Sequence, residues 1–354
     1  MKNKNILVIG GANIEYILKS KLPIVQGSKN FVEIEELFGG SGVNYSLRLL
    51  HYEERVIPLL FVGDDSTGEQ IYAKFAPFGI DKEKFFVPAL QTPRSTIIVE
   101  GTHRTILSQD ANKTNIFQPF LQQRCKEIAT VGAVIIGHIH NDRKEINQQQ
   151  DRLSSLYILE YFKSAKETLV YANFGASQLE YGFDFWKTHL CKIDIFQLNI
   201  YELRAFLDGG QSCNLACLIQ KIQDLGIHMI ITLDQFGAIG IMKGDKKRIF
   251  MARPINDTEN FVDSTGAGDA FCAGMVSVLK GDKNFSQAHF MKAMERGRSW
   301  ASYACNSYGG ANNCPSKEQI TRYHDEKSKD NAVVVYHDEA MRDLIALMDS
   351  MLKK

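Results

Sequence analysis

The chain has 354 residues, of which 44% are hydrophobic and 23% are charged, as in an average globular protein. This composition excludes disordered, collagen-like and coiled-coil proteins, and the length suits one large α/β domain or two small ones. Forty-one basic residues balance forty-one acidic ones, so the chain lacks the positive excess of a typical nucleic-acid binder, and no nucleic-acid partner is expected.

The seven cysteines are scattered along the chain and form no CxxC motif. Cys213 and Cys217 are spaced to share a helical face, but no second pair or nearby histidine completes a zinc site, so free thiols and a reducing compartment are expected. The first apolar run is short, unlike a signal peptide, and no stretch approaches ~20 apolar residues. We therefore expect a cytoplasmic protein without a membrane partner.

Short apolar runs alternate with helical patterns along most of the chain. This alternation predicts a mostly parallel sheet, and several runs are apolar on both faces, as in strands buried under helices. The predicted strands are 6–10, 56–62, 95–99, 133–137, 169–172, 193–198, 229–233, 238–242 and 248–251. The predicted helices are 43–51, 67–78, 120–130, 153–163, 215–225, 270–279 and 285–306.

Two regions interrupt the alternation, and they are predicted to form a small accessory sheet. Residues 13–38 alternate without a helical period, and residues 94–107 have the pattern of a hairpin. Near the C-terminus, residues 332–336 predict a strand and residues 339–351 an amphipathic helix. The apolar stripe of that helix either packs on the body or binds a partner.

The segment DSTGAGD, residues 263–269, leads into a predicted helix. Its glycine-rich turn would aim the amides of Gly266, Ala267 and Gly268 at one point, with the positive end of the helix dipole behind them. This arrangement suits a transferring phosphoryl group, and Asp269, kept ionised by the dipole, could accept the proton of a substrate hydroxyl. The alternative is an ordinary glycine turn with a capping aspartate.

Two further glycine turns precede predicted helices. In FGGSGVN, Gly39 and Gly40 would let the main chain approach a polyhydroxylated ligand, and Asn44 offers both a donor and an acceptor. In VGDDSTG, residues 62–68, capping and ligand contact are both open.

These three segments occur in the order found in the ribokinase-like (PfkB) family of carbohydrate and nucleoside kinases, and the chain resembles that family over about residues 5–316. The resemblance implies a three-layer α/β/α fold with a mostly parallel central sheet and a small β-sheet lid from about 13–38 and 94–107. Residues 1–316 would form the kinase domain, and residues 317–354 would be an extension packed on it. ATP and Mg²⁺ would be used, and lid pairing would allow a homodimer.

The resemblance also implies roles for single residues. The residues that resemble acceptor-binding positions are Asn13, Glu15, Gly39, Gly40, Asn44 and Asn112. Asn199 and Glu202 resemble the N-x-x-E element that organises Mg²⁺ and its waters around the triphosphate, and Thr232 and Gly237 resemble a turn that contacts nucleotide phosphates. Asp263 and the main chain around Thr265, with residues near Gly310, resemble a monovalent-cation site that would hold K⁺.

Two residues depart from the family pattern. Asp234 stands where the nucleotide turn usually has glycine, and its carboxylate would repel phosphates. Glu15 is one methylene longer than the family's aspartate. Two other positions stay open: Arg94 either reads a substrate anion or lies in solvent, and the His138–Asn141 run either contacts substrate or forms a loop.

Together these residues predict ATP-dependent phosphorylation of a primary hydroxyl of a small sugar, with Asp269 as the base and the 266–268 amides as the anion hole. A nucleoside kinase acting on adenosine-like acceptors is an alternative, because residues 172–176 and the spacing of Phe185, Trp186, Leu190, Asp194 and Phe196 resemble that branch. A catalytically silent member that binds a ligand or partner is the second alternative, and Asp234 and Glu15 point to it.

Overall fold

The computed structural model describes residues 4–20, 23–100, 103–109, 112, 115–128, 130–145, 153–208, 213–255, 257, 260–327 and 332–352. Within them, the main sheet contains β1 (Ile6–Gly11), β4 (Val56–Phe61), β7 (Ala133–Ile136), β8 (Leu169–Asn173), β9 (Ile195–Asn199), β10 (His228–Thr232), β11 (Ala238–Ile241), β12 (Arg248–Ala252) and β13 (Val333–His337). Their spatial order is β13-β12-β11-β10-β9-β8-β7-β1-β4. The strands from β10 to β4 pair in parallel, and the β10–β13 edge is antiparallel.

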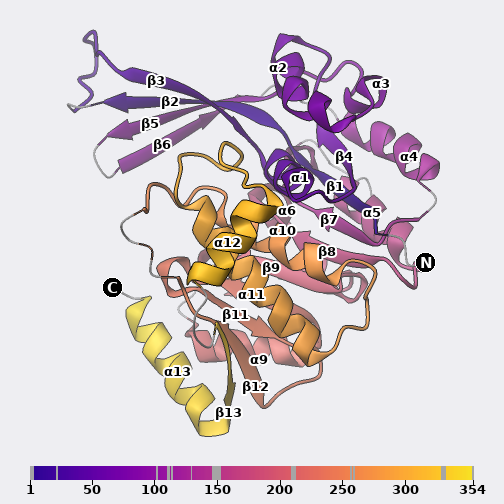
Figure 1. Ribbon diagram of the computed structural model, residues 1–354, viewed down its shortest axis with the longest axis vertical. Coiled ribbons are helices and arrows are strands. Elements are labelled where there is room, and N and C mark those ends of the chain that lie inside the picture. The colour runs from indigo at the N-terminus through magenta and orange to yellow at the C-terminus, as the bar shows by residue number, and fades with distance from the viewer. Residues whose placement is uncertain are drawn as a thin grey trace.

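The helices connect and cover these strands (Figure 1). They are α1 (Ser41–His51), α2 (Ser66–Phe75), α3 (Lys82–Phe85), α4 (Phe117–Glu127), α5 (Ser154–Phe162), α6 (Ala176–Leu179), α7 (Gly182–Trp186), α8 (Ile200–Asp208), α9 (Leu215–Leu225), α10 (Ala267–Leu279), α11 (Gln287–Ala304), α12 (Lys317–Lys327) and α13 (Asp338–Met351).

The main sheet separates two apolar cores, which makes the fold three-layered. In β1, Ile6 and Val8 join the core under α1, α10, α11 and α12, whereas Leu7 and Ile9 join the core under α4, α5, α8, α9 and α13. Alternate residues of a strand point to opposite faces, so a strand that is apolar throughout must be covered on both sides. The predicted strands and their buried character are confirmed.

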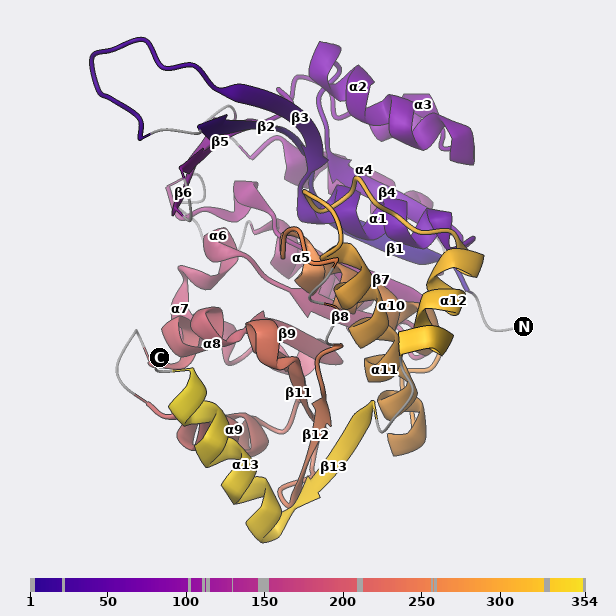
Figure 2. The same ribbon diagram turned by 60° about the vertical axis from the view of Figure 1, so that its left-hand side comes forward.

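A second sheet extends beyond the body, in the order β3-β2-β5-β6 (Figures 1 and 2). It consists of β2 (Asn13–Ser20), β3 (Glu33–Gly39), β5 (Arg94–Glu100) and β6 (His103–Ser108). We refer to these strands as the lid sheet. The predicted accessory sheet from the two irregular regions is therefore present, and both regions supply two strands each.

After the last family motif, the chain returns to the main sheet. β13 pairs antiparallel with β12 and forms the edge strand, and α13 packs against α9. The amide of Leu215, at the start of α9, donates to Asp349 Oδ1 of α13 at 3.0 Å. The apolar stripe of the last helix therefore lies on the body.

Two features differ from the sequence expectations. Five helices were not predicted: α3, α6 and α7 have only four or five residues each, Ile200 at the start of α8 continues the apolar run of β9, and α12 lies in a stretch with few apolar residues. Cys213 and Cys217 form a disulfide across the first turn of α9, so the expectation of free thiols is wrong for this pair. No helix in the described part of the chain is both long and apolar enough to cross a membrane.

Candidate active site

The start of α10 is built around Gly266. Gly266 has a φ of 76°, which glycine adopts without strain, and a Cβ here would lie 2.5 Å from the Cα of Gly310. The amide of Ala267 donates to the carbonyl of Ser264 at 3.1 Å, whereas those of Gly266 and Gly268 have no hydrogen-bond partner among the described residues. Two of the three amides predicted for the anion hole are therefore open, at the positive end of the helix dipole.

Asp269 lies in the first turn of α10 and contacts α1. Asn44 Nδ2 donates to Asp269 Oδ2 at 2.7 Å. Tyr45 is fully buried, and burial, together with the negative charge of Asp269, raises the pKa of its hydroxyl well above the ordinary value. Both neighbours are uncharged, so neither is a counterion of the Asp269 carboxylate.

Gly39 brings two predicted acceptor-binding side chains together. Asn13 of β2 is in register with Gly39 of β3, and a Cβ on Gly39 would lie 2.6 Å from the Glu15 carboxyl carbon and 2.8 Å from Asn13 Oδ1. Asn13 Nδ2 donates to Ser95 Oγ at 3.1 Å, but its Oδ1 is buried and has no hydrogen-bond partner among the described residues. A buried acceptor of this kind suits the hydroxyl of a bound molecule.

Gly40 carries the chain from the lid sheet into α1. Its φ is 90°, and a Cβ would lie 2.5 Å from the carbonyl oxygen of Gly11. The amide of Asn44 donates to the carbonyl of Gly40 at 3.0 Å, and Asn44 Oδ1 is a second buried acceptor without a partner in the described chain. Asn13, Glu15, Gly39, Gly40 and Asn44 thus form one surface beside Asp269.

Two residues near the base of the lid sheet make contacts within the fold. Asn112 Oδ1 accepts from the amide of Gln91 at 3.0 Å, and its Nδ2 donates to the carbonyl of Gln91 at 2.8 Å. Asn112 therefore holds the loop before β5, and its contact with an acceptor stays a prediction. Arg94 Nε donates to Thr67 Oγ1 at 2.8 Å, which ties β5 to α2.

Asn199 and Glu202 cap α8 reciprocally. Asn199 Oδ1 accepts from the amide of Glu202 at 2.8 Å, and Glu202 Oε2 accepts from the amide of Asn199 at 2.9 Å. Burial raises the pKa of Glu202, the negative charge of Asp269 adds to the rise, and His138 opposes it. Glu202 therefore lies within electrostatic reach of Asp269.

A magnesium ion fits this donor set. Mg²⁺ prefers oxygen ligands and is usually held by one or two carboxylates, waters and substrate phosphates. Glu202 and Asp269 repel each other, and a divalent cation near them would relieve that repulsion. Within the described residues no cluster of three metal-binding side chains exists, so the phosphates of a nucleotide would have to complete the coordination.

The predicted phosphate turn lies at the same edge of the sheet. Thr232 ends β10 in register with Asn199 at the end of β9. Gly237 has a φ of 93°, and a Cβ there would lie 2.1 Å from the carbonyl oxygen of Ala252, so only glycine fits. Ligands of open α/β sheets bind at the carboxyl ends of the strands, where these residues meet.

Asp234 has a left-handed backbone conformation, which glycine adopts without strain. Its φ is 49°, in the left-handed region that aspartate tolerates better than most residues. Its negative charge raises the pKa of the Tyr201 hydroxyl, so the carboxylate faces the exposed Tyr201 side chain at the edge of the turn.

Asp263 joins the glycine turn to the loop of residues 305–312, which follows α11. Its Oδ1 accepts from the amide and hydroxyl of Thr265 at 3.1 and 2.9 Å, and its Oδ2 accepts from the amide of Gly309 at 3.1 Å. The carbonyl of Gly310 accepts a hydrogen bond from Arg48 Nη2 at 2.6 Å. A K⁺ ion fits poorly here, because a permanent positive charge already occupies that carbonyl.

Sequence reasoning missed Gln197, a polar residue within the apolar run of β9. Gln197 Nε2 donates to the carbonyl of Gly268 at 2.9 Å, and its Oε1 accepts from the Tyr171 hydroxyl at 2.6 Å. Gln197 is buried, so this pair anchors the first turn of α10 to the sheet. A lone glutamine inside a buried strand was the available signal.

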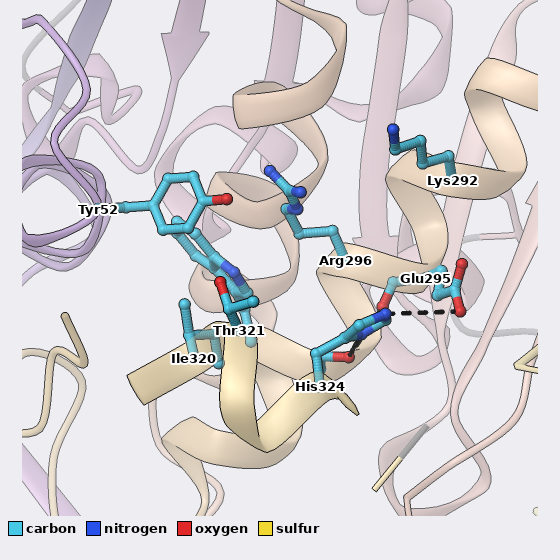
Figure 3. Close-up of a pocket in the computed structure, with 9 residues that line it drawn as sticks. Tyr52, Lys292, Glu295, Arg296, Ile320, Thr321 and His324 are labelled. Carbon is cyan, nitrogen blue, oxygen red and sulfur yellow. Dashed lines mark hydrogen bonds and ion pairs between the residues drawn. The ribbon is translucent and has the colours of Figure 1, made fainter. Parts of the chain in front are cut away.

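An open pocket of about 100 Å³ lies elsewhere, between α11, α12 and the residue after α1 (Figure 3). Its lining includes Tyr52, Arg296, Trp300 and His324, and none of the predicted site residues takes part. The candidate site is instead defined by the edge where α1, α10 and the ends of β9 and β10 meet.

Known proteins resemble this chain in sequence and in fold. A family model described as pfkB family carbohydrate kinase matches residues 3–317. The ribokinase of Giardia lamblia superposes with a TM-score of 0.72 at 16% sequence identity, covering 90% of this chain and 99% of that one. The Arabidopsis thaliana ribokinase complexed with ribose and ATP superposes with a TM-score of 0.71 at 17% sequence identity, covering 92% of this chain and 99% of that one.

The nucleoside kinase of Methanocaldococcus jannaschii gives a TM-score of 0.69 at 17% identity, covering 92% of this chain and 99% of that one. No curated protein sequence matches the chain. At these identities the structural likeness establishes the fold, and the family model covers nearly the whole sequence. The chain therefore belongs to the PfkB family of carbohydrate kinases and has the fold of the ribokinases.

Proposed function

We propose that this kinase transfers the γ-phosphoryl group of ATP to a primary hydroxyl of a small sugar. The observation that carries this proposal is the position of Asp269. It lies in the first turn of α10, beside the open amides of Gly266 and Gly268, and its Oδ2 is bonded to Asn44 on the acceptor side.

In the proposed reaction, Asp269 accepts the proton of the acceptor hydroxyl. That oxygen then forms a bond to the γ-phosphorus, the bond from phosphorus to the β-bridging oxygen breaks, and ADP leaves. The amides of Gly266 and Gly268 would stabilise the charge on the transferring group, which has a loose transition state and needs little force from the base. Bound Mg²⁺, near Asn199 and Glu202, would neutralise charge on the phosphates.

The acceptor surface suits a polyhydroxylated molecule. Asn13 Oδ1 and Asn44 Oδ1 are buried acceptors that a bound hydroxyl would satisfy, and Glu15 lies against Gly39 in the same surface. Asn13 and Glu15 belong to β2 of the lid sheet. Movement of that sheet toward the body would exclude water, which otherwise competes for the phosphoryl group.

The aromatic spacing that suggested a nucleoside acceptor has a different explanation in the fold. Trp186 is fully buried and its ring centroid lies 4.6 Å from that of Phe174, which in turn contacts Phe196. These rings belong to the core below the sheet, where they leave no face open to a base. The spacing of these rings therefore gives no separate support to a nucleoside acceptor.

The test is ADP release from Mg-ATP with pentoses, hexoses, sugar acids, sugar phosphates and nucleosides. A sugar should give turnover that falls by about 100-fold or more in Asp269→Asn, because a general base contributes about that much. Asp224→Asn, on the exposed face of α9, is the matched control and should retain activity. Turnover with nucleosides alone would favour the second acceptor class, and absence of both turnover and nucleotide binding would favour the silent member.

We also propose a homodimer formed through the lid sheet. Its outer strands expose Ile34 and Leu107, which are 66% and 55% exposed in one chain. Apolar residues on open strands commonly mark an interface. Light scattering during size-exclusion chromatography should give a molar mass twice that of one chain. The Ile34→Lys variant should have a lower molar mass, closer to that of the monomer.

A further inference from the structure

Arg48 is a buried cation on the helix that carries Asn44. It lies one turn after Asn44 in α1 and is 2% exposed. None of the ion pairs among the described residues includes it. A charge removed from water without a counterion is costly, so a guanidinium in this position needs compensation from another source.

The guanidinium points at the loop that supports the proposed anion hole. Arg48 Nη2 donates to the carbonyl of Gly310 at 2.6 Å, and Arg48 Nε has no hydrogen-bond partner in the described chain. Its charge also opposes the burial that raises the pKa values of the thiols of Cys305, at the start of this loop, and Cys314, two residues beyond its end.

Gly310 connects Arg48 to the reacting groups. A Cβ on Gly310 would lie 2.2 Å from Asn44 Nδ2, and a Cβ on Gly266 would lie 2.5 Å from the Gly310 Cα. Gly310 is thus packed between the residue that binds Asp269 and the residue that begins α10. The hydrogen bond from the Arg48 guanidinium therefore holds the loop of Gly310 against Asn44 and Gly266.

We propose that Arg48 is a positioning residue that serves as a built-in cation, so this kinase neither binds nor needs K⁺ at the Asp263–Gly310 site. The guanidinium donates to the Gly310 carbonyl, which a monovalent cation would coordinate, and its positive charge repels a second cation there. The anionic phosphates proposed to bind at Gly266 and Gly268 supply the compensation that the protein lacks. This last statement rests on the proposed function, whereas the exclusion of K⁺ does not.

The first experiment follows thermal unfolding of the free protein in KCl and in choline chloride at equal ionic strength of about 0.1 M. Wild-type protein should have the same melting temperature in both salts. Arg48→Gln should melt at a lower temperature in choline chloride and regain part of the loss in KCl, because its freed carbonyls can accept the ion. Arg55→Gln, an exposed arginine just after α1, should behave as wild type.

A saturable rise of the wild-type melting temperature with KCl would overturn the proposal, and so would an Arg48→Gln protein indifferent to K⁺. The wild-type comparison stands even if Arg48→Gln does not fold. Arg48→Lys keeps the positive charge, so its melting temperature should be the same in KCl and in choline chloride.

The second experiment measures binding of Mg-AMP-PNP by calorimetry in the same two salts. The wild-type affinities in the two salts should agree within about twofold, and Arg48→Gln should bind about tenfold more weakly in choline chloride, as expected for loss of one buried charge. Tighter wild-type binding in KCl by about tenfold would overturn the proposal. If wild-type protein binds no nucleotide in either salt, the proposed function fails, and the unfolding experiment still decides the role of Arg48.

Discussion

Asn44 Nδ2 and Asp269 Oδ2 are joined by a hydrogen bond of 2.7 Å between residues 225 positions apart. Asn44 begins the surface predicted to hold the acceptor, and Asp269 is the proposed base. The bond holds Asp269 Oδ2, so Asn44 restricts the orientation of the carboxylate that we propose as the base. Asn44 therefore connects acceptor binding to the orientation of the base.

Removal of this bond should reduce turnover more than binding. Asn44→Ala is expected to lower kcat/KM by roughly 10- to 100-fold, the range for one hydrogen bond to a charged group. Asn214→Ala is the matched control, because Asn214 caps α9 through the amide of Cys217 and should cost stability without loss of activity. Steady-state kinetics of both variants would be measured with the acceptor identified among the sugars and nucleosides. Unchanged kinetics of Asn44→Ala would contradict the role assigned to Asn44.

Nucleotide binding should depend on the protonation of Glu202. Its pKa is raised above 4.5 by burial and then by the charge of Asp269, so the carboxylate becomes neutral at a higher pH than an exposed glutamate. Affinity for Mg-AMP-PNP should therefore fall as pH decreases from about 7.5 to about 5. Asp269→Asn removes one negative charge and should move this transition to lower pH, and Glu202→Gln should flatten it. Titration calorimetry across this range would check the order of the three profiles.

Gly310 should tolerate no side chain. In Gly310→Ala, the Cβ would meet Asn44 Nδ2 at 2.2 Å, so either the loop or Asn44 must move. We expect a loss of activity of at least about tenfold with a modest change in melting temperature. Gly79→Ala is a control, since a Cβ at Gly79 has nothing within 4 Å and only its φ of 71° is strained. Equal activity of the two variants would argue against the packing described for Gly310.

Asp142 should make stability depend on pH. Its carboxylate is buried and accepts from the amides of Ser154 and Ser155 at 2.6 and 2.9 Å, at the start of α5. Burial raises its pKa from 3.8 to about 6. Because the folded-state pKa is the higher one, this group's contribution to the free energy of unfolding is fully present below pH 3.8 and is lost as pH rises through about 6.

Urea unfolding at several pH values would test this contribution. The free energy of unfolding of wild-type protein should fall relative to that of Asp142→Asn as pH rises from about 4 to about 6, because asparagine does not ionise. A constant difference between the two proteins across that interval would show that Asp142 is already ionised at its low end.

Local sequence determined the elements of the site. The apolar runs predicted the strands, and the glycines at 39, 40, 237 and 266 marked turns whose φ values or close contacts only glycine allows. Asp269 could be singled out because it stands at a predicted helix start after a glycine turn, in a segment that resembles the PfkB family. Such features depend on a few neighbouring residues, whose backbone preferences act at short range.

Tertiary structure alone decided how those elements work together. Asn44 was predicted to bind the acceptor and proves also to hold Asp269, whereas Asn112 binds the main chain of Gln91. Arg48 carried no signal in the sequence, because an arginine in an amphipathic helix is ordinarily exposed, and only the contact with Gly310, 262 positions away, makes it a buried cation. Hydrogen bonds and burial between distant segments follow from how the layers pack, and no local periodicity encodes that packing.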